Sequence, residues 1–118
     1  MAHDVVIERK TYAEGDVVFK QGSTGRTAFI VQKGAVDIVH TTPEGEEKVL
    51  ANISVGAIFG EMSLIDDRPR MAMARASEPT TVIVVTEQMF LHKLEHADPF
   101  IRGLMHIMAE TIRAMSDK

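Results

Sequence analysis

Short apolar runs, each bounded by turn residues, fill the first two thirds of this 118-residue chain. Lys33 and Gly34 separate two of these runs in the manner of a tight hairpin. The run at residues 80–85 is β-branched and almost entirely apolar, so we expect it to be buried on both faces. Many short strands at close spacing predict a β-roll (jelly-roll) and not a βαβ fold. The runs lie at residues 5–7, 17–19, 27–32, 35–40, 49–53, 57–59, 71–76 and 80–85.

The last third of the chain changes to helical spacing. Apolar residues recur every three or four positions within residues 87–95, which predicts one helix. Asp98 followed by Pro99 is a strong helix start, with Asp as the N-cap and Pro in the first turn. One apolar stripe then predicts a second helix, through Ile101, Leu104, Met108, Thr111 and Met115. We expect one mainly β domain, with a roll at about residues 5–86 and C-terminal helices at about 87–116.

Composition narrows the classes of protein that fit. A chain of 118 residues is long enough for one hydrophobic core. Its formal charge of −4 argues against a nucleic-acid binder, and the absence of cysteine removes disulfides and thiol chemistry. No apolar run reaches the length of a membrane helix, and the N-terminus has charges where a signal peptide needs an apolar stretch. We therefore expect a cytoplasmic module that does not contact a membrane.

Residues 59–76 contain the candidate chemistry. Gly60 allows a close approach of backbone to a ligand, Glu61 can accept from sugar hydroxyls, and Arg70 can pair with a phosphate. Backbone N–H groups of residues 61–64 would point at the same anion if these residues open a helix. A capped turn and a solvated arginine are the ordinary interpretations of these residues taken singly. Their combination, nine residues apart around a polar loop, favours a site.

The segment resembles the phosphate-binding cassette of cyclic nucleotide-binding domains, the cAMP and cGMP sensors of kinases, channels and catabolite-activator-like regulators. The resemblance also covers residues 12–22, 28–36 and 55–61, and so nearly the whole chain. It implies an eight-stranded β-roll with N-terminal helices, a short cassette helix and two C-terminal helices. It also implies a regulatory function, no enzymatic activity, no cofactor, and cAMP or cGMP as the ligand.

The resemblance assigns a role to each residue of the candidate site. Arg70 would bind the phosphate through its side chain, and Glu61 the ribose, with Gly60 beside it. Val49 and Leu50 would line the purine slot. Backbone groups that would complete the phosphate site belong to Met62, Ser63, Met71 and Ala72.

Met71 departs from the usual pattern of the family. Ala, Ser or Thr often follows the phosphate-binding arginine, and a hydroxyl there can bond guanine or phosphate. Methionine offers no such hydrogen bond, although its backbone still can. The departure favours cAMP over cGMP, and a bulky side chain also leaves open weak binding or a different small anion.

The C-terminal stripe leaves three alternatives open. It can pack on the roll, it can move over the ligand as a lid, or it can pair with a second copy in a homodimer. In the lid hypothesis ligand binding reorders the helix, and the capping residues are Ile101, Leu104, Met105, Ile107 and Met108. The signal would pass to an effector protein or to a fused domain.

Other functions fit the sequence less well. A degenerate roll that binds only protein is the alternative, although Glu61 and Arg70 argue against it. A cupin-type metalloenzyme needs a His-x-His pair, which does not occur. His92 and His96 are four residues apart and could face one metal, but two surface histidines are the simpler interpretation.

Overall fold

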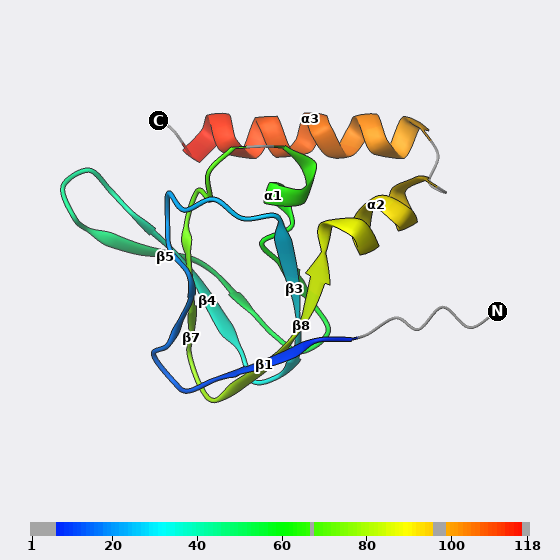
Figure 1. The fold of residues 1–118 in the computed structure, drawn as a ribbon. Helices are drawn as coiled ribbons and strands as arrows, with labels where there is room; N and C mark the ends of the chain where they lie inside the picture. The colour runs from blue at the N-terminus through cyan, green and yellow to red at the C-terminus, as the bar shows by residue number, and fades with distance from the viewer. Residues whose placement is uncertain (1–6, 67, 96–98, 117–118) are drawn as a thin grey trace.

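The computed structural model describes residues 7–66, 68–95 and 99–116, and Figure 1 shows a β-roll with helices gathered at one end. All strand pairs are antiparallel, and they form two four-stranded sheets ordered β1-β8-β3-β6 and β2-β7-β4-β5. The predicted fold class, an eight-stranded β-roll with a short cassette helix and two C-terminal helices, is confirmed. The elements are β1 (Arg9–Tyr12), β2 (Val17–Phe19), β3 (Thr27–Lys33), β4 (Val36–Thr41), β5 (Glu47–Ile53), β6 (Ile58–Phe59), α1 (Met62–Ile65), β7 (Met73–Ala76), β8 (Thr80–Thr86), α2 (Glu87–Glu95) and α3 (Pro99–Ser116).

The first strand differs from the prediction. We expected a strand at residues 5–7, but Ile7 is exposed and lies outside any strand, while residues 5 and 6 lie outside the described part. The strand β1 lies instead at Arg9–Tyr12 and pairs with β8. Its side chains are polar and mostly exposed, so backbone pairing fixes it and no apolar pattern marks it.

The core lies between the two sheets. Buried and partly buried residues alternate along β7 and β8, and on β8 Val82 and Val84 are buried while Ile83 and Val85 are only partly covered. The expectation that residues 80–85 are buried on both faces is therefore wrong, because the outer face of this sheet is only partly covered. The buried cluster consists of Phe29, Val31, Val36, Phe59, Ala74, Val82 and Val84.

The helices begin where the sequence predicts. The bounds of α2 match the expected range, and α3 begins at Pro99, whereas the expected N-cap Asp98 lies outside the described residues. N-terminal helices would have to precede β1, where Ile7 and Glu8 are described and are not helical. No helix in the described ranges combines the length and apolar character needed to cross a membrane.

Helix α3 does not bury its apolar stripe against the roll. Figure 1 shows α3 crossing the end of the roll above α1, with which it is in contact. The packing alternative for the stripe is wrong for the side chains that the structure describes, because they are exposed to solvent. These are Phe100, Ile101, Leu104, Ile107, Met108 and Ile112.

Candidate functional site

The turn after β6 places a glycine where any other residue would be strained. Gly60 has a φ of 76°, in the left-handed region that side chains rarely adopt. A Cβ on Gly60 would lie 2.9 Å from Nη1 of Arg70 and 3.1 Å from the ring of Phe19. The chain therefore needs a glycine here to bring backbone, cation and aromatic ring together.

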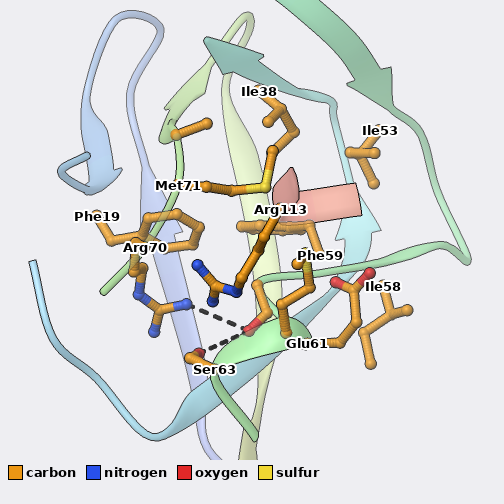
Figure 2. Close-up of a pocket in the computed structure, with 13 residues that line it drawn as sticks. Phe19, Ile38, Ile53, Ile58, Phe59, Glu61, Ser63, Arg70, Met71 and Arg113 are labelled. Carbon is orange, nitrogen blue, oxygen red and sulfur yellow. Dashed lines mark hydrogen bonds between the residues drawn. The ribbon is translucent and has the colours of Figure 1, made fainter. Parts of the chain in front are cut away.

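Arg70 is buried, with 7% of its surface exposed, and is held from several sides. Its Nη1 donates to the carbonyl oxygen of Gly60 at 3.2 Å (Figure 2). Its Nη2 donates to the carbonyl oxygen of Thr27 at 2.9 Å. The guanidinium carbon lies 3.9 Å from the centre of the Phe19 ring, which adds a cation–π contact. Burial lowers the pKa of Arg70, but a guanidinium remains charged in a protein. The site thus contains a fixed positive charge.

The backbone of Arg70 is fixed as well. Its N–H donates to the carbonyl of Ser23, and its own carbonyl accepts from the N–H of Gly22. Gly25, in the same loop, lies so close that a Cβ there would be 2.7 Å from Nη2 of Arg70. The loop between β2 and β3 therefore packs against Arg70 and fixes its backbone.

Glu61 stands at the N-cap of α1 and makes no side-chain capping bond. In the described structure its carboxylate and Arg70 form no ion pair, and Figure 2 shows the two groups on different sides of the Gly60 carbonyl. The Glu61 carboxylate is therefore not neutralised by direct contact with the guanidinium of Arg70. The carboxylate is only partly buried and has acceptor oxygens to offer a ligand.

The short helix offers fewer free donors than expected. The N–H of Leu64 donates to the carbonyl of Glu61 at 3.0 Å, so it does not point at a ligand. The prediction that N–H groups of residues 61–64 converge on the anion is wrong for Leu64. The hydroxyl of Ser63 donates to the Gly60 carbonyl at 2.9 Å and reinforces the turn (Figure 2).

A cavity of about 140 Å³ opens beside these groups. The structure brings together there all seven residues predicted for phosphate and ribose binding. They are Gly60, Glu61, Met62, Ser63, Arg70, Met71 and Ala72.

The remaining wall of the cavity was not predicted. Apolar side chains from four strands complete it, and they come from positions separated widely in sequence. Strand alternation could have indicated that such residues point inward, but not that they share a cavity with the loop at residues 60–72. They are Phe19, Ile38, Ile53, Ile58 and Phe59.

Met71, the residue after Arg70, lies in the wall of the cavity. Its carbonyl oxygen lies 3.0 Å from Nδ1 of His40, on β4. The contact fixes the backbone on the strand side of the cavity, which Met71 lines.

The predicted purine slot and lid are not assembled at the cavity. Val49 and Leu50 lie on β5, an edge strand, and are 59% and 48% exposed. Ile101, Leu104 and Met108, like Ile107, lie on the exposed stripe of α3 and not among the lining residues. Met105 lies on α3, but its side chain is outside the described part. These assignments remain predictions.

Helix α3 does reach the cavity, through an arginine that the sequence pattern did not single out. Arg113 lines it and is 5% exposed. Its Nε and Nη2 donate to the two carboxylate oxygens of Asp66, at 2.9 and 3.0 Å, and its Nη1 donates to the carbonyl of Pro69 at 2.8 Å. The only signal in the sequence was its place off the apolar stripe, between Ile112 and Ala114.

A metal centre finds no support in the described residues, among which no three His, Asp or Glu side chains are grouped to hold an ion. His92 lies on α2, while His96 lies outside the described part. The predicted pairing of these two histidines on one metal is not tested.

Known proteins are similar to this chain in both sequence and fold. A family model described as a cyclic nucleotide-binding domain matches residues 9–97. The cyclic AMP receptor protein of Thermus thermophilus is 31% identical over 106 residues, which are 90% of this chain and 49% of the receptor. The cAMP-dependent protein kinase regulatory subunit of Blastocladiella emersonii is 37% identical over 70 residues, 59% of this chain and 17% of that protein.

Solved structures agree. The cAMP-bound form of the EAL enzyme Bd1971 matches with a TM-score of 0.83 and 34% identity, covering 90% of this chain and 28% of the enzyme. Its cGMP-bound form matches with a TM-score of 0.84 and 33% identity, covering 93% and 29%. This chain therefore belongs to the cyclic nucleotide-binding domain family, and it spans about half or less of the length of these relatives.

Proposed function

We propose that the chain is a sensor module that binds a cyclic nucleotide monophosphate, with cAMP favoured over cGMP. The observation that carries the proposal is a cavity that gathers a buried cation, a partly exposed carboxylate and an apolar wall. These match the three parts of the ligand, which are an anionic cyclic phosphate, a ribose hydroxyl and a flat base. Two of the solved relatives are described as cAMP-bound and cGMP-bound forms.

In this proposal Arg70 binds the phosphate. Its bonds to the carbonyl oxygens of Gly60 and Thr27 use at most three of the five N–H donors of a guanidinium. The others remain for phosphate oxygens, and burial strengthens such charge-assisted hydrogen bonds. Backbone N–H groups of Met62, Ser63, Met71 and Ala72 would supply further contacts.

Glu61 binds the ribose hydroxyl, since an ionised carboxylate only accepts. The apolar wall of the cavity, which includes Phe19 and Phe59, receives the base or the sugar edge. Val49 and Leu50 would join this wall only if β5 moved toward the cavity. Met71 supplies no hydroxyl to read guanine, which favours cAMP.

Calorimetric titration with cAMP and with cGMP tests the site. We expect Arg70→Lys, which keeps the charge but loses the fork, and Glu61→Gln each to weaken binding by about 1.5–3 kcal/mol, the range for a charged hydrogen bond. The matched control is Arg75→Gln, because Arg75 lies on β7, pairs with Glu47 and does not line the cavity. Unchanged affinity in both site variants, with the control behaving normally, would refute the assignment.

The exposed stripe of α3 is the surface through which such a module would signal. We infer that it meets apolar surface of an effector protein, a fused domain or a second copy of the chain, because six large apolar side chains on one helix are exposed. The proposed module has regulatory and not catalytic activity, and a cytoplasmic location remains a prediction. The same stripe favours the second candidate function, a protein-binding roll without a ligand.

Light scattering after size exclusion tests the homodimer. We expect Ile107→Glu to raise the dimer dissociation constant by about tenfold or more, because it places a charge in an apolar interface. His106→Glu is the matched control, since it adds the same charge at the neighbouring exposed position. A wild-type chain that stays monomeric at all concentrations would exclude the homodimer. Self-association without any nucleotide binding would favour the second candidate function.

A further inference from the structure

The attachment of α3 to the roll is polar where the structure describes it. Among the described side chains of α3, Arg113 is the one that is buried, and Arg102 is partly buried. The large apolar side chains described on this helix are exposed to solvent. A helix usually docks through its apolar face. Among the described side chains of α3, the forked ion pair of Arg113 makes this contact instead.

The partners of Arg113 belong to the candidate site. Asp66 is the C-cap of α1, the helix that begins beside Glu61, and Pro69 immediately precedes Arg70. The guanidinium of Arg113 therefore binds at residue 66 and at residue 69. These are the two ends of the short segment that joins residues 60–63 of the site to residues 70–72. The same side chain also lines the cavity (Figure 2).

We propose that Arg113 is the positioning residue through which occupancy of the cavity is coupled to docking of α3. This inference depends on the proposed function and names the residue that regulates it. When α3 is docked, Arg113 neutralises Asp66 and presents its remaining N–H donors beside the anion site. When α3 leaves, Asp66 keeps an unpaired carboxylate on the loop that precedes Arg70, and its negative charge disfavours a phosphate bound at Arg70.

Thermodynamic reciprocity then fixes the direction of the effect. A docked α3 raises the affinity for the nucleotide, so the nucleotide must by the same factor favour the docked α3. The change in α3 reorients its exposed stripe, which is the surface proposed above for partners. The ion pair is thus the connection between the ligand and the partner surface.

The test combines calorimetry with amide exchange of residues 99–116 in the full chain, using cAMP. The wild-type chain should gain protection in α3 on binding. Arg113→Gln should bind about ten- to hundredfold more weakly and show no gain in α3 even at saturating cAMP. Arg102→Gln is the matched control, because Arg102 lies on the same helix and does not line the cavity.

Two further variants separate coupling from misfolding. Breaking a buried pair can destabilise a protein, so Asp66→Asn combined with Arg113→Gln removes the unpaired charge and should recover part of the lost affinity but not the protection of α3. Arg113→Lys keeps the charge without the fork and should give an intermediate affinity.

Each outcome decides between the hypotheses. Two results would overturn the role of Arg113 without affecting the proposed function. One is wild-type affinity for cAMP in Arg113→Gln, and the other is a weaker affinity in which α3 still gains protection on binding. Failure of the wild-type chain to bind either nucleotide would overturn the proposed function, and this inference with it.

Discussion

The β-roll and helix α3 treat large apolar side chains in opposite ways. In the roll, Phe59 is 2% exposed and lies among Phe19 and Phe29, with ring centres 6.1 and 5.3 Å away. On α3, Phe100 is 72% exposed and its apolar neighbours are also at the surface. The roll is stabilised by its own core, whereas among the described side chains of α3 only Arg113 is buried. The difference teaches that the roll has a core of its own, and it supports the proposal that α3 is the part that changes position.

Removing one phenylalanine side chain from each region tests whether the roll and α3 differ in how much apolar burial stabilises them. Phe59→Ala should lower the free energy of unfolding by about 3–5 kcal/mol, because it opens a cavity in the core. Phe100→Ala should change it by no more than about 0.5 kcal/mol, as for a surface substitution. Urea denaturation followed by circular dichroism measures both.

Protein concentration is the control for this pair. At low concentration an effect of Phe100→Ala as large as that of Phe59→Ala would contradict the comparison, since it would mean that the outer face of α3 is covered within one chain. An effect that appears only at high concentration would instead indicate that a second copy covers it.

A matched pair of glycines sharpens the comparison. We expect alanine to destabilise the protein at one of them and to stabilise it at the other, and both effects should be smaller than that of Phe59→Ala. Gly34, between β3 and β4, has a φ of 90°, and a Cβ there would lie 2.3 Å from the carbonyl oxygen of Pro79. Gly34→Ala should therefore cost about 1–2 kcal/mol from the left-handed backbone alone, and more from the clash. A Cβ on Gly103, within α3, would meet no atom of another element within 4 Å, so Gly103→Ala should stabilise the helix by about 0.5–1 kcal/mol.

Thermal unfolding and amide exchange of the two alanine variants measure these changes in stability. The melting temperature should fall for Gly34→Ala, whereas α3 should gain amide protection in Gly103→Ala. Equal losses in both variants would mean that α3 is packed as tightly as the hairpin turn and that the two regions do not differ.

The loop at residues 60–72 could be predicted because its chemistry is local. Gly60, Glu61 and Arg70 lie close together in the sequence, and the turn brings the predicted phosphate and ribose residues to one cavity. Most strand positions could also be predicted, because alternation and turn residues mark them. Strand β1 could not, because its side chains are polar and the pairing with β8 alone defines it.

The apolar wall and the contact of Arg113 with the cavity could not be predicted, for a different reason. Ile38 and Ile53 reach the cavity from neighbouring strands, and which cavity they share depends on the folding of both sheets. An amphipathic stripe predicts a helix but not the surface that the stripe faces. The stripe directed attention to apolar lid residues and away from Arg113, the residue that connects α3 to the cavity.

The immobilised state of Arg70 has a consequence for the thermodynamics of recognition. A long flexible side chain normally loses up to about 2 kcal/mol of rotamer entropy when it is fixed. Here the bonds to Gly60 and Thr27 and the ring of Phe19 fix the arginine during folding. In the proposed function the phosphate would therefore meet a cation already in place, and the entropic cost of ordering this side chain would fall on folding and not on binding.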